Sequence, residues 1–128
     1  MESKLRYVPL PVYRDRAEVL KVLADGSKSD LMLLSLAVGE SFPDWKFAQD
    51  ICLKLLTSED EEIRANACQG LGYVARTKKR LEKHLVKPYL LRELRSQTAF
   101  KWRIEDAIDD INQYLGWKIS KKSSVSDA

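Results

Sequence analysis

One segment, residues 63–76, constrains the fold of this chain more than any other part of the sequence. Its small and apolar side chains recur at the spacing of a single face of an α-helix. They are Ile63, Ala67, Leu71 and Val74. Ala67 and Gly70 are small enough to let another helix come close. The segment therefore predicts a helix that packs tightly against a neighbouring helix.

The charges that flank this segment support the same prediction. Acidic residues fill positions 59–62, and basic residues fill most of positions 76–80. Carboxylates are favourable near the N-terminus of a helix and cations near its C-terminus. Ser58 and Glu61 also have the spacing of a capping box. We therefore expect a helix over residues 59–76 that starts from Ser58.

Comparable periodic faces predict further helices on both sides of it. Their approximate ranges are 14–25, 27–39, 43–56, 78–96 and 98–115. Pro88 lies inside the fourth of these ranges and predicts a break or a kink there. Thr98 is the expected N-cap of the last helix. The fold class expected from the sequence is all-α.

The ends of the chain differ from this helical part. Pro9 and Pro11 disfavour helix and predict an extended lead-in over residues 1–13, ahead of a helical domain at 14–117. Residues 118–128 are rich in Ser and Lys, which predicts disorder. The longest apolar run is too short to span a bilayer, and the N-terminus has no apolar signal core. We expect a cytoplasmic protein without a membrane partner.

Residues 58–76 resemble the second helix of a HEAT repeat. A shift of 40 residues lays Ala67 on Ala107 and Leu71 on Ile111. HEAT and armadillo units repeat every ~40–47 residues. The resemblance implies a short α-solenoid of about three HEAT-like helical hairpins, a scaffold that typically holds a partner.

In HEAT proteins the second helices line the concave surface, so the resemblance also implies where a partner binds. It selects the outward stripe of residues 59–76 and its counterpart 40 residues later. The candidate partner-binding residues are Glu62, Asn66, Gln69, Tyr73, Trp102, Asp106, Asp109, Asp110 and Gln113. The aspartates lie in the middle of a helix, where the helix dipole does not explain them. We expect an acidic, amide-rich patch with two aromatic anchors.

The sequence offers little for catalysis. His84 is the only histidine, and the two cysteines, Cys52 and Cys68, lie far from it in sequence. A zinc site of the usual composition cannot be assembled from them. The cysteines are interpreted as small buried hydrophobic residues, with a redox switch as the alternative. We expect no enzyme activity, no metal and no cofactor.

The chain resembles small bacterial immunity proteins of contact-dependent growth inhibition systems in its size, its expected architecture and its lack of a catalytic set. The resemblance implies tight binding of a cognate toxin domain, typically a nuclease, and occlusion of its active site by the acidic patch. Electrostatic attraction would speed capture. The overall charge of +3 departs from the acidic character expected of such an inhibitor.

Two alternatives follow from the same sequence. Residues 1–64 carry 9 basic and 12 acidic side chains, whereas residues 65–128 carry 13 and 7. A basic stripe over 78–103 would suit nucleic-acid binding. It consists of Lys78, Lys79, Arg80, Lys83, Lys87, Arg92, Arg95, Lys101 and Arg103. The other alternative is a generic scaffold or adaptor.

Overall fold

The computed structural model describes residues 9–97 and 99–121, and this part of the chain contains six helices and no strand. The helices are α1 (Arg16–Asp25), α2 (Lys28–Ser41), α3 (Trp45–Leu55), α4 (Glu61–Lys78), α5 (Lys83–Ser96) and α6 (Lys101–Leu115). The predicted all-α class is confirmed. The first eight residues of the predicted lead-in, the predicted cap Thr98 and residues 122–128 lie outside the described part.

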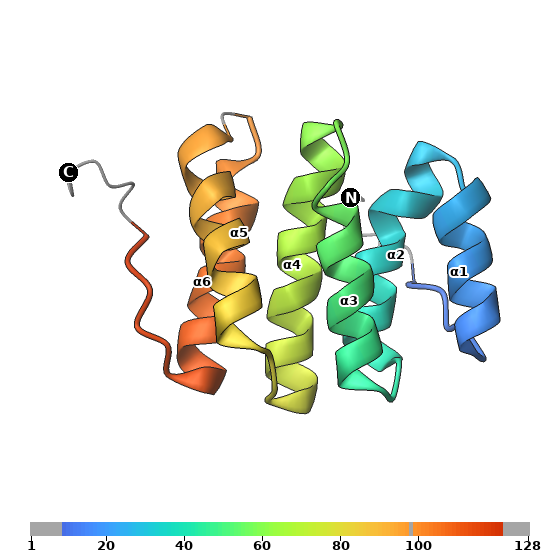
Figure 1. The fold of residues 1–128 in the computed structure, drawn as a ribbon, viewed down its shortest axis with the longest axis horizontal. Coiled ribbons are helices and arrows are strands. Elements are labelled where there is room, and N and C mark those ends of the chain that lie inside the picture. The colour runs from blue at the N-terminus through green and yellow to red at the C-terminus, as the bar shows by residue number, and fades with distance from the viewer. Residues whose placement is uncertain (1–8, 98, 122–128) are drawn as a thin grey trace, which may run out of the picture.

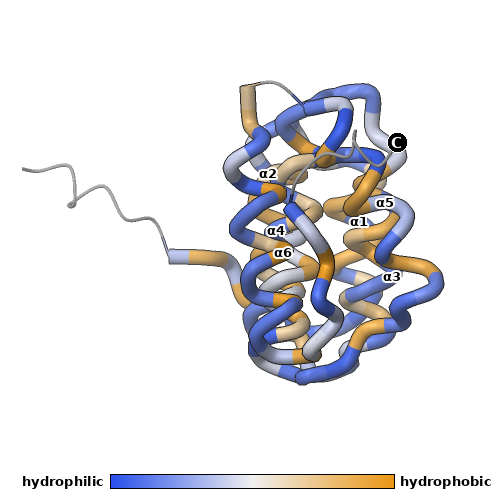
Figure 2. The backbone as a smooth tube through the Cα atoms, turned by 90° about the vertical axis from the view of Figure 1, so that its left-hand side faces the viewer, coloured by the Kyte–Doolittle hydropathy of each residue, from blue (hydrophilic) through white to orange (hydrophobic). Residues whose placement is uncertain are grey.

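The helices form two layers that run side by side (Figures 1 and 2). One layer contains α2, α4 and α6, in which α4 packs extensively against both neighbours. The other contains α1, α3 and α5 (Figure 2). Each helix of the second layer contacts the helix that follows it in the chain. The central helix α4 is the 63–76 segment that the sequence singled out.

Short polar side chains begin the first four helices. Asp15, Ser27, Asp44 and Asp60 each accept hydrogen bonds from backbone amides of the first turn. The capping box predicted at Ser58 is wrong, because Asp60 is the N-cap of α4 and accepts from the amides of Glu62 and Ile63. Ser58 instead accepts from the amide of Asp60. A complete capping box occurs at Ser27, which pairs with Asp30.

Pro88 lies inside a continuous helix, so the predicted break is wrong, while the alternative of a kink stays a prediction. Helix α5 runs without interruption from Lys83 to Ser96. Proline removes one backbone donor from a helix interior, which is unfavourable in isolation. Val86 and Leu90, on either side of Pro88, are fully buried. Burial of this apolar face keeps the helix continuous.

Glycines allow the backbone of α4 to come into contact with the backbones of α2 and α6. A Cβ atom added to Gly70 would lie 2.6 Å from the carbonyl oxygen of Ser35, and one on Gly39 would lie 2.5 Å from the carbonyl of Gly70. On the other side, Gly72 faces Ala107, where an added Cβ would lie 3.2 Å from Cα. The close approach expected at Gly70 is confirmed. These contacts set α2, α4 and α6 in contact along one continuous surface.

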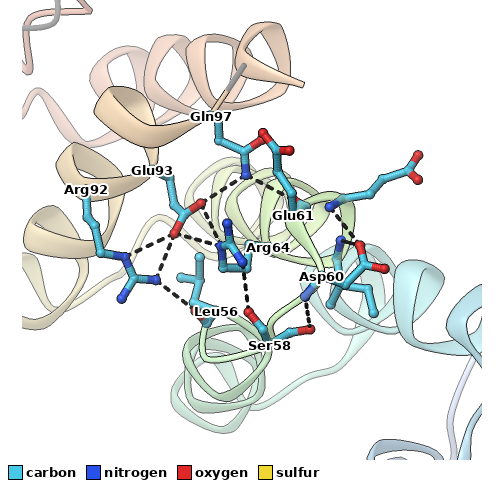
Figure 3. Close-up of polar contacts among 10 residues, drawn as sticks. Leu56, Ser58, Asp60, Glu61, Arg64, Arg92, Glu93 and Gln97 are labelled. Atoms are coloured by element: carbon cyan, nitrogen blue, oxygen red, sulfur yellow. Dashed lines mark hydrogen bonds and ion pairs between the residues drawn. The ribbon is translucent and has the colours of Figure 1, made fainter. Parts of the chain in front are cut away.

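A buried carboxylate ties the two layers together (Figure 3). Glu93 of α5 is 1% exposed and accepts from Arg64 of α4, from Arg92 and from Gln97. Burial alone would raise the pKa of Glu93, but these hydrogen bonds outweigh it and hold the pKa below its ordinary value. Arg64 also donates to the carbonyl of Ser58, which anchors the turn before α4.

Packing continues past the predicted domain boundary at residue 117. Ile119 is buried, and its backbone exchanges two hydrogen bonds with the side chain of Asn112 on α6. The chain up to Lys121 therefore lies against α6 rather than projecting from it, whereas disorder was expected from residue 118.

Candidate functional site

A groove between α4 and α6 brings together five of the nine candidate partner-binding residues. Gln69 and Tyr73 come from α4, and Asp106, Asp109 and Asp110 come from α6. Ala107 lines the groove between the aspartates. The volume of the groove is about 320 Å³. The contact of Gly72 with Ala107 brings the two helices close enough for their polar neighbours to share this space. We call these six residues the acidic groove.

The pKa of Asp110 is raised mainly by burial, with a smaller contribution from the neighbouring carboxylates. Burial raises the pKa of Asp110 above its ordinary value. Arg76, whose Nη1 lies 4.0 Å from Asp110 Oδ2, opposes the rise. Asp106 and Asp109 add to it. A cation entering the groove would therefore relieve a repulsion that already exists.

Two basic side chains partly compensate this charge from the edges. Lys121 Nζ lies 2.8 Å from Asp109 Oδ1. Arg76 pairs with Glu40 of α2 and lies over the ring of Tyr73, 4.5 Å from its centroid. In the described residues, Asp106 has no ion-pair partner, and it is exposed. The groove therefore presents net negative charge to an approaching molecule.

Tyr73 also lines a second depression, beside the N-terminal segment. Its other walls are Glu40, Ser41 and residues 9–12, and its volume is about 430 Å³. Val12 in this segment is 74% exposed. The partly buried ring of Tyr73 thus separates an acidic hollow from one with an apolar rim. Residues 9–12 were not among the predicted site residues, and no spacing pattern in the sequence places them beside α4.

Two predicted residues, Glu62 and Asn66, are engaged inside the molecule. Asn66 is 5% exposed, donates to the carbonyl of Met32 and accepts from Arg103. Glu62 is paired with Arg103 at 3.3 Å and with Lys28 at 3.4 Å. Their polar atoms connect α2, α4 and α6. Glu62 therefore adds little net charge to the surface, and Asn66 offers almost no exposed area.

Trp102 and Gln113 are exposed on α6 outside the acidic groove. Trp102 is 54% exposed. The Arg103 guanidinium lies 5.3 Å from its ring centroid. This contact holds the indole beside α6 while leaving much of it uncovered. The anchor role of Trp102 remains a prediction.

The basic stripe over 78–103 is not a free row of cations. Arg92 donates to Glu93 and to the carbonyl of Leu56, and Arg103 is held by Glu62 and Asn66. Lys79 and Arg80 lie over the rings of Tyr114 and Trp45. Lys83 likewise lies over the ring of Trp117. Of the remaining cations in the stripe, Lys87 and Arg95 lie on α5.

Both cysteines are buried and free. Burial raises the pKa of each thiol, which makes the reactive thiolate scarce. This environment favours the interpretation as buried hydrophobic residues over a redox switch. In residues 9–97 and 99–121, no group of three His, Cys, Asp or Glu side chains is arranged to hold a metal ion. Among the described helices, none has the length and apolarity needed to cross a bilayer.

Comparison with known proteins gives one structural relationship. No protein-family model matches the sequence, and no curated protein matches it. The structure is similar to a chain in the crystal structure of a CDI complex from Cupriavidus taiwanensis LMG 19424. The TM-score is 0.73 at 23% sequence identity, and the match covers 85% of this chain and 96% of that one. The two chains therefore share an all-α fold over nearly their whole length.

Proposed function

We propose that this chain is an immunity protein of a contact-dependent growth inhibition system. Its work is to bind a cognate toxin domain tightly in the cytoplasm and to block it without catalysis. The similarity in fold to a chain of a CDI complex supports this class of function. The acidic groove on the α4 and α6 surface is the observation that carries the binding site.

The proposed scaffold is a short HEAT-like solenoid, with α1 and α2, α3 and α4, and α5 and α6 as its three hairpins. In this arrangement the layer of α2, α4 and α6 carries the partner. The order of helix contacts within that layer, α2 with α4 and α4 with α6, supports the assignment. The toxin then lies across the second helix of each hairpin.

The proposed mechanism is occlusion by charge complementarity. Asp106, Asp109 and Asp110 meet basic side chains at the toxin's substrate cleft, and Tyr73 and Trp102 pack against its apolar surface. A nuclease is the favoured target, because a nuclease must attract phosphate and so carries a basic cleft. The overall charge of +3 is compatible with this, since the negative charge is local to one groove.

Co-expression tests the function and the site separately. The toxin domain encoded beside this chain's gene is expressed in a bacterial host with and without this protein. Wild-type protein should restore growth. If the wild-type protein does not restore growth, the proposed function is refuted. The double variant Asp106→Lys/Asp109→Lys should abolish rescue and weaken binding by a hundredfold or more, which is about 2.7 kcal/mol.

The matched control is Asp25→Lys/Asp50→Lys, which reverses two exposed charges on α1 and α3. It should leave growth rescue and affinity unchanged. If wild-type protein protects and the double variant protects equally well, the function stands but the acidic groove is the wrong surface.

A further inference from the structure

A second groove lies on α5. Helix α5 belongs to the layer opposite that of α4 and α6, which form the acidic groove (Figure 2). The second groove is lined by Lys83, His84, Lys87, Pro88, Leu91 and Arg95, and its volume is about 410 Å³. Positions 84, 88, 91 and 95 recur at helical spacing, so they form one stripe along α5. We call these six residues the basic groove.

The basic groove is amphipathic in cross-section. Pro88 and Leu91 form an apolar strip, and the cations of Lys87 and Arg95 flank it. Leu85, one turn from Pro88, is 39% exposed and extends the apolar surface. No acidic side chain lines this groove.

Lys87 and Arg95 differ from most other described cations because they are not paired, whereas Lys83 lies 5.8 Å from the ring centroid of Trp117. Arg64, Arg92 and Arg103 are all held by carboxylates. Within the described ranges 9–97 and 99–121, Lys87 and Arg95 have neither an ion pair nor a hydrogen bond from their side chains. Their charge is therefore available to an external anion without the loss of an internal contact.

The apolar strip decides what kind of anion fits. Single-stranded nucleic acid is bound by cations together with aromatic rings on which bases stack. Here the strip is proline and leucine, and the lining contains no Phe, Tyr or Trp side chain. An aliphatic strip flanked by cations complements an amphipathic acidic peptide, whose apolar side chain fills the groove while its carboxylates meet Lys87 and Arg95.

We propose that the basic groove of α5 is a docking surface for an acidic segment of a second protein, anchored by one apolar side chain. Because it lies on the other layer from the acidic groove, it can be occupied while a toxin domain is bound. The surface does not depend on the proposed immunity function, so the two fail independently.

Fluorescence anisotropy with a labelled peptide tests this docking surface. The probe is a short fluorescein-labelled peptide of glutamate pairs alternating with leucine, and it is titrated with the full chain. Saturable binding is expected. The variant Lys87→Glu/Arg95→Glu should weaken it by about tenfold or more, since two attractions become repulsions.

A matched control separates a local site from general charge. Lys21→Glu/Lys54→Glu makes the same change in net charge at exposed positions on α1 and α3, and it should change the affinity less than twofold. Replacing the leucines of the probe by serine tests the apolar strip without altering the protein, and it should also weaken binding by about tenfold.

Five results would overturn the proposal. The wild-type chain fails to bind the probe, the two double variants bind it equally, or the serine probe binds as well as the leucine probe. The fourth is a higher affinity for a single-stranded oligonucleotide than for the peptide, which would assign the groove to nucleic acid. The fifth result comes from sedimentation of the protein without a probe. If the wild-type chain self-associates and Lys87→Glu/Arg95→Glu does not, the occupant of the groove is a second copy of this chain, and the proposal is refuted.

Discussion

Arg103 on α6 donates from Nη1 to the side-chain oxygen of Asn66 on α4 at a distance of 2.8 Å. Asn66 in turn donates to the carbonyl of Met32 on α2. One guanidinium and one amide therefore connect all three helices of the layer that carries the acidic groove. Tyr73 and Asp106 lie on two of these helices, although neither residue takes part in the connection.

Removal of Arg103 should therefore destabilise the protein more than an exposed cation would. Arg103→Ala leaves the buried oxygen of Asn66 unpaired and should lower the free energy of unfolding by about 1–3 kcal/mol. Lys101→Ala, at the start of the same helix, should change it by less than about 0.5 kcal/mol. Urea denaturation followed by circular dichroism measures both. Equal effects would show that the connection contributes nothing beyond surface charge.

The buried carboxylate of Glu93 gives a second prediction. Glu93→Gln keeps the shape but removes the charge that pairs with Arg64 and Arg92, and loss of one partner of a buried pair costs about 3 kcal/mol or more. Glu59→Gln, at an exposed position, is the control. A cost no larger than that of the control would contradict the role given to the network in Figure 3.

The stabilities of the wild type and of Glu93→Gln should respond differently to acid. The pKa of Glu93 is lower in the folded state than its ordinary value of 4.5, so its ionisation stabilises the fold at neutral pH. That contribution is lost as the pH falls below the ordinary value and through the folded pKa. The stability difference between wild type and Glu93→Gln should therefore shrink on acidification. A constant or growing difference would mean that the charge is not the stabilising feature.

The helices were predictable because each depends on a local pattern, whereas much of the site depends on contacts between helices. The apolar stripe that contains Ala67 and Leu71 identifies α4 from the sequence alone. The 40-residue offset placed Gln69, Tyr73, Asp106 and Asp109 on adjoining helices, and the structure brings them into one groove. The same offset could not show that Asn66 is buried, because its burial requires Arg103 to reach across from α6.

The two local errors have a similar origin. Pro88 and Ser58 were interpreted from intrinsic preferences, a helix breaker and a capping residue. In the structure the burial of Val86 and Leu90 outweighs the helix-breaking preference of Pro88. Asp60, rather than Ser58, is the N-cap of α4. Tertiary packing and a nearby stronger cap decide both positions.

Glycine-to-alanine substitutions should separate the two interfaces of α4. In Gly70→Ala the new Cβ would lie 2.6 Å from the backbone oxygen of Ser35, which cannot move without shifting α2. Overpacking of this kind costs about 1–3 kcal/mol. In Gly72→Ala the nearest atom, Ala107 Cα, is 3.2 Å away, and the gain in helix propensity of about 1 kcal/mol offsets most of the strain. In thermal unfolding, the Tm of Gly70→Ala should be well below the Tm of Gly72→Ala. The reverse order would contradict the close contact of α2 with α4.

The proposed toxin interface predicts a specific dependence on salt. Exposed charges that steer association are screened within about 8 Å at physiological ionic strength, so the association rate should fall as salt increases. Neutralising the acidic groove with Asp106→Asn/Asp109→Asn should reduce both the rate at low salt and its slope against ionic strength, with a smaller change in the dissociation rate. Glu18→Gln/Asp25→Asn, on α1, makes the same change in net charge away from the groove and should leave the slope near that of the wild type. Stopped-flow or surface-based kinetics with the cognate toxin domain measures these rates. If both double variants lower the slope equally, the net charge of the chain, rather than the acidic groove, steers the encounter.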